Sequence, residues 1–200
     1  MSAFLEVCDL SVEIGGLTAL RDVSISVDRG ECIGLVGETG SGKSLTCRAI
    51  IGMLPRIGAR VTAGRVMLDG IDLVTLDPRG WSAIRGYRIG FVPQASMAAL
   101  DPVMRVGNQL RETISILDPA ANREQRAIEL LESVRLPDVG RVLRSYPHEL
   151  SGGMRQRVMI ALALAGGAPL LVADEPTTAL DVTVQAQILD LLRSLVRERG

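Results

Sequence analysis

A glycine-rich segment from Gly37 to Ser44 carries the clearest chemical pattern in the sequence. It reads G-E-T-G-S-G-K-S and fits the phosphate-binding P-loop pattern, G-x-x-x-x-G-K-S/T. Glycines let backbone N–H groups approach phosphate oxygens, and the N-terminus of a following helix adds its positive dipole end. We expect Lys43 to reach the β- and γ-phosphates of a nucleoside triphosphate, and the Ser44 hydroxyl to ligate Mg²⁺. The predicted phosphate cradle consists of Gly37, Glu38, Thr39, Gly40, Ser41, Gly42, Lys43 and Ser44.

An acidic pair follows the apolar run at residues 170–173. Asp174 and Glu175 come directly after it, and a parallel strand buried on both faces places functional residues at its carboxyl end. We expect Asp174 to meet the Mg²⁺ held by Ser44, and Glu175 to orient and deprotonate a water for in-line attack on the γ-phosphate. An acidic pair after a strand is otherwise an ordinary helix cap or solvated turn, so the P-loop is what favours the catalytic interpretation.

A third segment, Leu150 to Arg157, opens a predicted helix. Ser151 has the residue type of an N-cap, and Gly152 and Gly153 expose backbone N–H groups at the positive helix end. The segment predicts a second phosphate-binding surface in addition to the P-loop. One small domain can use two such surfaces if each contacts a different nucleotide. Taken alone, Ser-Gly-Gly is equally consistent with a capped helix that has a glycine-rich entry.

The elements that position these segments are predicted from hydrophobic periodicity. They indicate an α/β fold with a P-loop NTPase core, an antiparallel β edge and an inserted helical subdomain. We expect a single domain over residues 1–200, with the core at about 1–94 and 166–200 and the helical subdomain at about 95–165. The predicted strands are 3–14, 20–28, 32–36, 65–68, 88–93 and 170–173, and the predicted helices are 45–53, 104–117, 123–135, 152–165 and 181–199.

Composition excludes several function classes. A net charge of −1 and 2% aromatic residues argue against a nucleic-acid-binding surface. Cys8, Cys32 and Cys47 follow no metal-binding spacing, and we interpret them as reduced, buried thiols of a cytosolic protein. The N-terminus lacks a signal pattern, and the longest uncharged run, 158–173, is too short to span a membrane. We therefore expect a soluble chain whose membrane role comes through a partner.

The order and spacing of these segments resemble the nucleotide-binding subunit of an ATP-binding cassette (ABC) transporter over essentially the whole chain. Residues 37–44 look like Walker A and 170–175 like Walker B, while 150–156 look like the family signature. Gln94 resembles the Q-loop glutamine and Ala179-Leu180-Asp181 the D-loop. Residues 37–44, 100–104 and 146–161 look closest to the oligopeptide, dipeptide and nickel importer branch.

The resemblance implies a translocase ATPase that couples Mg-ATP hydrolysis to the transport of peptides or a related small solute. It also implies a head-to-tail homo- or heterodimer, in which each ATP lies between Walker A of one subunit and the signature of the other. Two permease subunits and an extracytoplasmic solute-binding protein would complete a transporter with this subunit peripheral on the cytoplasmic face. Beyond the P-loop, the implied nucleotide contacts are Ile14, Ser151, Gly152, Gly153 and Asp181, the implied Mg²⁺ ligands are Ser44, Gln94 and Asp174, and the implied catalytic residues are Lys43, Gln94 and Glu175.

Two features depart from the family pattern. An aromatic residue usually stacks on adenine, but residues 12–16 contain none, so Ile14 is the expected substitute. The family's switch histidine follows one more core strand, whereas this sequence stops at Gly200 and its one histidine, His148, precedes the signature. We therefore expect a subunit truncated before its last core strands, with His148 as a local structural residue. Two alternatives stay open: a non-catalytic remnant that only binds ATP, and a soluble ABC ATPase outside transport.

Overall fold

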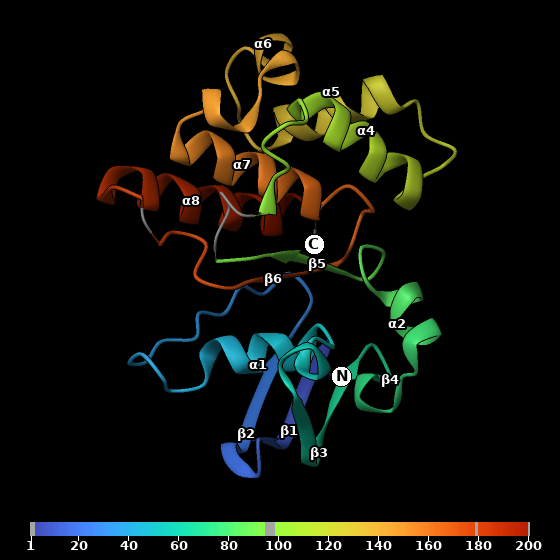
Figure 1. Ribbon diagram of the computed structural model, residues 1–200, viewed down its shortest axis with the longest axis vertical. Coiled ribbons are helices and arrows are strands. Elements are labelled where there is room, and N and C mark those ends of the chain that lie inside the picture. The colour runs from blue at the N-terminus through green and yellow to red at the C-terminus, as the bar shows by residue number, and fades with distance from the viewer. Residues whose placement is uncertain (1–2, 95–98, 179, 200) are drawn as a thin grey trace. The chain divides into compact units, whose positions relative to one another are not determined.

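In the computed structural model, the described residues are 3–94, 99–178 and 180–199. The chain forms two compact units: unit 1, which is Met1–Ile84 with Arg199–Gly200, and unit 2, which is Arg85–Glu198. Figure 1 shows strands β1 to β4 with helices α1 and α2 in unit 1, and strands β5 and β6 with helices α4 to α8 in unit 2. The P-loop therefore belongs to unit 1, and the acidic pair and the signature segment belong to unit 2.

Unit 1 is built on an antiparallel sheet with strand order β2-β1-β3-β4. Its strands are β1 (Leu5–Ile14), β2 (Leu17–Val27), β3 (Ala59–Leu68) and β4 (Ile71–Asp72). The predicted antiparallel strand pair is confirmed, since β1 pairs with β2 from Leu5↔Val27 to Ile14↔Leu17. The Asp69-Gly70 turn has positive φ at both residues, 49° and 81°, as a two-residue hairpin requires.

The pairing of β1 with β2 shifts register at three places between Val7 and Glu13. Asp9 and Asp22 adopt left-handed φ angles of 46° and 50°, and each exchanges two hydrogen bonds with a serine on the opposite strand. Ser24 Oγ accepts from the Asp9 N–H at 2.9 Å and donates to Asp9 Oδ1 at 3.0 Å. Ser11 Oγ accepts from the Asp22 N–H at 3.1 Å and donates to Asp22 Oδ1 at 3.3 Å. These side chains satisfy the backbone groups that a bulge would otherwise leave without a partner.

The helices of unit 1 are short. They are α1 (Lys43–Ile50), η1 (Leu54–Ile57), η2 (Leu73–Thr75) and α2 (Pro78–Ile84). The predicted helix at 45–53 is confirmed as α1 with shifted bounds, whereas the sequence did not predict α2.

The predicted buried strand at 32–36 is wrong. These residues form no strand, and Val36 is 94% exposed. A strand needs a neighbour for its backbone groups, and among the described residues the sheet of unit 1 pairs only β2, β1, β3 and β4. The expectation of buried thiols fails at the same place, because Cys32 is exposed and Cys8 half-buried, and only Cys47 is buried.

Unit 2 contains a two-stranded parallel sheet. Both strands were predicted from their apolar runs, and the structure adds that β5 (Ile89–Val92) pairs with β6 (Leu170–Ala173) in register from Ile89↔Leu170 to Val92↔Ala173. Gly90 is required in β5, because a Cβ there would lie 2.3 Å from the carbonyl oxygen of Ala163 at the end of α7. The helix backbone thus packs directly on the strand.

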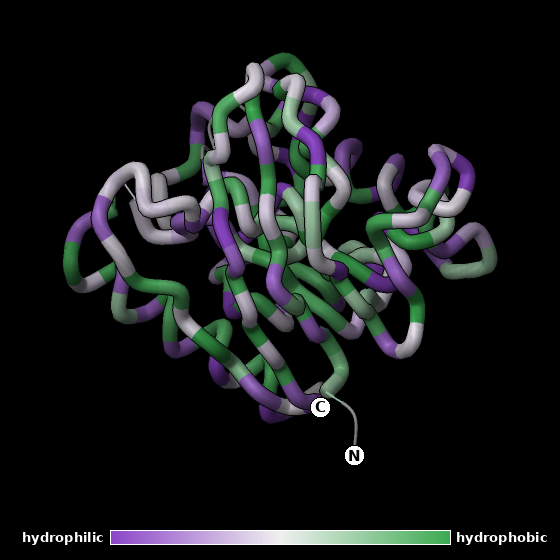
Figure 2. The backbone as a smooth tube through the Cα atoms, turned by 90° about the horizontal axis from the view of Figure 1, so that it is seen from below, coloured by the Kyte–Doolittle hydropathy of each residue, from purple (hydrophilic) through white to green (hydrophobic). Residues whose placement is uncertain are grey.

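The helices of unit 2 are α4 (Val106–Leu117), α5 (Arg123–Ser133), α6 (Val139–Arg144), α7 (Gly152–Ala163) and α8 (Val182–Arg199). All but α6 were predicted within a few residues. In Figure 2, hydrophobic and hydrophilic residues interleave along the chain, as amphipathic elements require. The division into a core and a helical subdomain stays a prediction. Within the described ranges, no helix is both long and apolar enough to cross a membrane.

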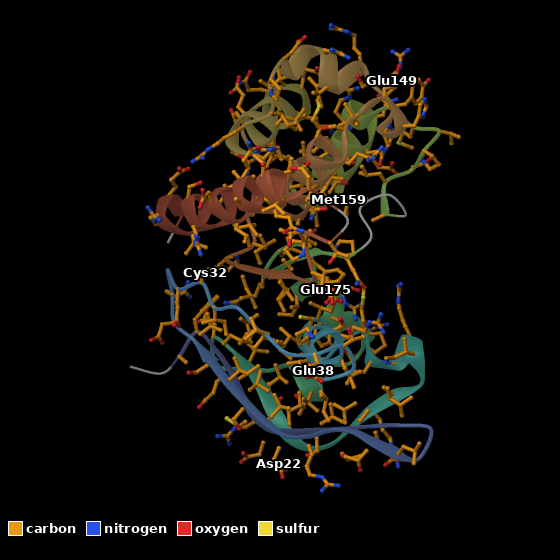
Figure 3. All side chains as sticks on the ribbon, turned by 90° about the vertical axis from the view of Figure 1, so that its left-hand side faces the viewer. Asp22, Cys32, Glu38, Glu149, Met159 and Glu175 are labelled. Carbon is orange, nitrogen blue, oxygen red and sulfur yellow. The ribbon has the colours of Figure 1, made fainter. Side chains whose placement is uncertain are left out.

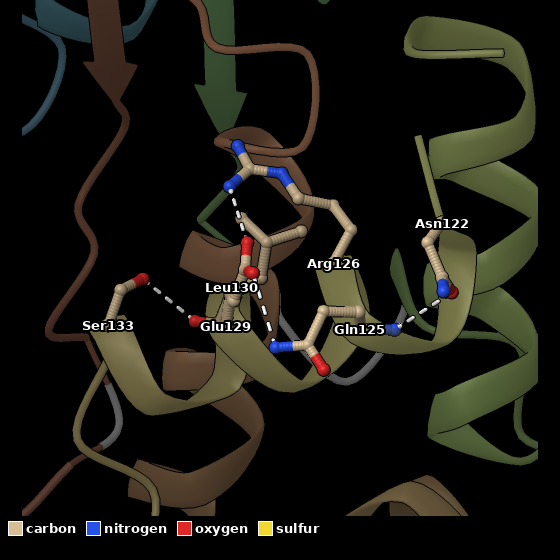
Figure 4. Close-up of polar contacts among 6 residues, drawn as sticks. All are labelled: Asn122, Gln125, Arg126, Glu129, Leu130 and Ser133. Atoms are coloured by element: carbon tan, nitrogen blue, oxygen red, sulfur yellow. Dashed lines mark hydrogen bonds and ion pairs between the residues drawn. The ribbon is translucent and has the colours of Figure 1, made fainter. Parts of the chain in front are cut away.

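Helix α5 illustrates how these helices are held. Figure 4 shows Asn122, its N-cap, accepting from the Gln125 N–H at 3.3 Å, and the Arg126–Glu129 ion pair at 3.4 Å. Ala127, Leu130 and Leu131 form the fully buried face of this helix. The apolar face anchors the helix, and the polar groups complete its solvent side.

Candidate nucleotide-binding and hydrolysis site

The P-loop closes around the side chain of Lys43. The Lys43 Nζ donates to the carbonyl oxygens of Gly37 at 2.6 Å and Glu38 at 2.8 Å, and lies 3.4 Å from Ser41 Oγ. The loop is also tied internally, since the Ser41 N–H donates to the Glu38 carbonyl at 3.1 Å. Figure 3 labels Glu38 in this segment. The ammonium group of Lys43 therefore lies inside the loop. A positive charge in this position can attract a phosphate group.

Gly42 forms the N-cap of α1, with a left-handed φ of 93° and no side-chain cap. Its carbonyl oxygen accepts from the Thr46 N–H at 2.8 Å and from Thr46 Oγ1 at 3.0 Å. The first N–H groups of a helix have no acceptor within the helix, so this end can donate to an anion. Together with Gly40, whose φ is 85°, Gly42 gives the loop a backbone shape that other residues rarely adopt.

Ile14, the predicted adenine contact, ends β1 in the same unit. It is half-buried and lies opposite Leu17, which is 76% exposed. Beside it, Glu13 forms an ion pair with Arg60 at 3.2 Å. The hairpin thus presents aliphatic side chains, and the contact of Ile14 with adenine stays a prediction.

In unit 2, the parallel sheet brings Gln94 and Glu175 together. Each follows the carboxyl end of its strand, and the Gln94 Nε2 donates to Glu175 Oε2 at 2.5 Å. The hydroxyl of Thr178, which the sequence analysis did not single out, donates to the same oxygen at 2.9 Å. Glu175 adopts a left-handed backbone φ of 48°, and the two hydrogen bonds hold its carboxylate in place. The signal that could have found Thr178 is its position one turn after Glu175.

Asp174 is buried, at 6% exposed, and its N–H donates to the Val92 carbonyl at 2.9 Å. It thus stands at the edge where β5 and β6 end. Its predicted partner at Mg²⁺, Ser44, belongs to the other unit, so the shared metal site stays a prediction.

The signature segment has the predicted cap, since Ser151 Oγ accepts from the Met154 N–H at 3.3 Å at the start of α7. Its two glycines also pack closely against neighbouring side chains. A Cβ on Gly152 would lie 3.0 Å from Leu180 Cδ2, and one on Gly153 only 2.6 Å from Val184 Cγ1. The phosphate-binding role of this segment stays a prediction, and any substitution at Gly153 also disturbs the contact with α8.

The remaining predicted residues have structural partners. Asp181 caps α8 by accepting from the Val184 N–H at 3.0 Å, while Ala179 of the predicted D-loop lies outside the described residues. His148 stacks on Tyr146 with ring centroids 5.6 Å apart, as expected of a local structural residue. In α7, burial lowers the pKa of Arg157, with a smaller contribution from the nearby charge of Arg135. Arg157 donates to the Val134 carbonyl at 2.8 Å.

Comparisons with known proteins identify the family of this chain. The sequence pattern of the family described as "ABC transporter" matches residues 20–178. The oligopeptide transport ATP-binding protein OppD of Bacillus subtilis is 44% identical over 206 residues, covering 99% of this chain and 57% of that protein. A putative peptide import ATP-binding protein of Brucella melitensis, BMEII0206, is 47% identical over 197 residues, covering 96% of this chain and 59% of that protein.

A solved structure of the ATP-binding cassette MJ0796, dimeric in a post-hydrolysis state bound to ADP and Pi, matches with a TM-score of 0.82 and 32% identity. The match covers 98% of this chain and 84% of that one. The present chain spans less than two thirds of the length of the two curated relatives. Because the family pattern covers most of the chain and the fold is that of a solved cassette, the chain belongs to the ABC transporter family.

Proposed function

We propose that the chain binds Mg-ATP at residues 37–44 and hydrolyses it as the ATPase subunit of an importer for peptides or a related small solute. The observation that carries this proposal is the P-loop closed around Lys43, with Nζ 2.6 and 2.8 Å from two loop carbonyls. Bound triphosphate would replace those carbonyls as the partner of the ammonium group, and charge-assisted contacts to phosphate are stronger than contacts to neutral carbonyls.

The hydrolytic step depends on Glu175. Both of its described side-chain hydrogen bonds, from Gln94 and Thr178, end on Oε2. We therefore assign Oε1 as the oxygen that accepts a proton from the attacking water. Gln94 and Thr178 fix the carboxylate plane, so the base is oriented before substrate arrives. Asp174 and Ser44 would hold the Mg²⁺ that accompanies ATP, and that ion would offset the charge of the phosphates.

The transported solute is proposed from the names of the relatives, which are an oligopeptide transport protein and a putative peptide import protein. The dimeric state is proposed from the solved cassette MJ0796. In such a dimer, the Ser151 end of α7 would contact the nucleotide on the P-loop of the second subunit. The chain would lie at the cytoplasmic face of the membrane through its permease subunits, with a solute-binding protein outside.

A groove in unit 2 supports the proposal of a membrane partner. It has a volume of about 650 Å³ and is bordered by α4, α5 and α6. Its charged lining residues are Asp101, Arg105, Arg111, Glu124 and Arg144. Glu124 is paired with Arg111 at 2.8 Å, whereas Arg105 and Arg144 form no ion pair with any residue in the described ranges. We propose that an acidic cytoplasmic loop of a permease subunit binds here.

Peptide uptake tests the proposal. Cells that lack the gene would be complemented with the parent or with Lys43→Ala, and uptake of a labelled tripeptide compared with that of its free amino acids. We expect the parent to restore tripeptide uptake and Lys43→Ala not to restore it. Uptake of the free amino acids should be the same with either protein. Purified parent protein that binds Mg-ATP without releasing phosphate would favour the non-catalytic alternative. Phosphate release without any change in peptide uptake would favour an ABC ATPase outside peptide transport.

A further inference from the structure

Leu20 lies against the backbone of the P-loop. A Cβ built on Gly42 would be 2.2 Å from Leu20 Cδ2 and 3.6 Å from its Cγ. The Leu20 methyl group therefore occupies the space that a side chain at residue 42 would need. Leu20 is itself 5% exposed and held in β2 opposite Val12, which is fully buried. The contact joins the antiparallel sheet of unit 1 to its phosphate-binding loop.

The peptide group after Gly42 is held from a second side. Thr46 donates to the Gly42 carbonyl through its N–H and its hydroxyl, at 2.8 and 3.0 Å. Because a peptide group is planar and trans, fixing this carbonyl also fixes the opposite direction of the Lys43 N–H. That N–H is among the first of α1, where an anion is expected to bind. Leu20 and Thr46 together thus determine where it points.

We propose that Leu20 is a positioning residue for nucleotide binding, acting by holding Gly42 in its left-handed conformation. A glycine has more accessible backbone conformations than any other residue, so Gly42 needs an outside constraint to stay at a φ of 93°. Without the Leu20 methyl group, the loop at residues 37–44 would become ordered only when nucleotide binds. The free energy needed to order the loop would then lower the affinity for nucleotide. The inference rests on the proposed function, since it names a determinant of ATP affinity outside the Walker motifs.

The far end of α1 has a comparable contact that provides a reporter. Gly52, with a φ of 68°, lies against Trp81, and a Cβ there would be 2.3 Å from the indole ring. Trp81 is the one tryptophan of the sequence. Its fluorescence therefore reports the unfolding of unit 1 in every variant, independently of ATP binding.

The test compares one substitution at two sites of the same sheet. Leu20→Val removes the δ carbons that reach Gly42 and keeps a residue suited to a strand. Leu68→Val makes the same change in β3, at a side chain with 0% exposure. Leu20→Met is the conservative variant, because it keeps the reach of the side chain. Affinity for Mg-ATP and for Mg-triphosphate, which lacks base and ribose, would be measured by calorimetry on the full chain.

We expect Leu20→Val to weaken binding of both ligands by about threefold to tenfold. Leu68→Val should lose at least as much thermal stability with unchanged affinity, and Leu20→Met should bind like the parent. Unchanged affinity in Leu20→Val, an equal loss in Leu68→Val, or a loss confined to Mg-ATP would each overturn the inference. A parent chain that binds neither ligand would instead contradict the proposed function.

Discussion

The P-loop and the acidic edge of β6 differ in what holds their functional groups in place. In unit 1, the loop at residues 37–44 is shaped by its own glycines and by Lys43 bonded to its own carbonyls. In unit 2, Gln94 and Glu175 are 81 positions apart in sequence and meet only because β5 and β6 pair in parallel. Apart from the contact of Leu20 with Gly42, the first site is determined by local sequence, whereas the second depends on long-range strand pairing.

The difference predicts how each site fails. A locally determined site should lose its ligand when one of its own groups is removed, with little change in the unit's stability. A site built by strand pairing should lose activity together with stability when the packing behind it is disturbed. The predictions below are ordered from the largest expected effect to the smallest.

Lys43→Ala should cause the largest loss. It removes the cation inside the loop, so the triphosphate would keep an uncompensated charge. We expect Mg-ATP affinity to fall on the order of a hundredfold or more, with the unfolding temperature nearly unchanged. Calorimetry and Trp81 fluorescence measure the two quantities. Near-parental affinity would contradict the P-loop assignment, and a large loss of stability would contradict the local character of this site.

Gly90→Ala should affect the other site. The added methyl group would meet the Ala163 carbonyl at 2.3 Å and push β5 away from α7. We expect a loss of about 1–3 kcal/mol in the free energy of unfolding, and a parallel fall in phosphate release as Gln94 moves relative to Glu175. Binding of Mg-ATP to the P-loop should persist. If binding fell as steeply as hydrolysis, the two regions would not differ as described.

Asn122→Ala should have the smallest effect. It removes the N-cap of α5, which accepts from the Gln125 N–H, and such caps contribute about 1 kcal/mol. We expect this loss in denaturant unfolding, with ATP binding and phosphate release unchanged, because α5 carries none of the proposed nucleotide-binding or catalytic residues. A marked change in hydrolysis would show that the helical part of unit 2 influences catalysis more directly than we infer.

Prediction from sequence succeeded where a pattern is local or periodic. The glycine-rich loop, the apolar runs of β5 and β6 and the amphipathic helices all follow from short-range residue order. The strand expected at 32–36 failed because strand formation depends on a neighbour that the local sequence does not specify. Leu20 was missed because its contact with Gly42 depends on the tertiary structure. Thr178 was missed because its spacing of three residues from Glu175 was the signal available, and the sequence analysis did not use it. The signature glycines had a clear pattern, but their contact with Leu180 and Val184 required the tertiary structure.

The central claim is that the P-loop binds ATP and that Glu175 is the base that deprotonates the water attacking the γ-phosphate. It is tested most directly by measuring Mg-ATP binding and phosphate release on the same preparation of Glu175→Gln. Glutamine can hold a water but cannot take its proton, so binding should match the parent. Phosphate release should fall on the order of a hundredfold to ten-thousandfold. Phosphate release at the parental rate, or a loss of binding equal to the loss of hydrolysis, would contradict the account.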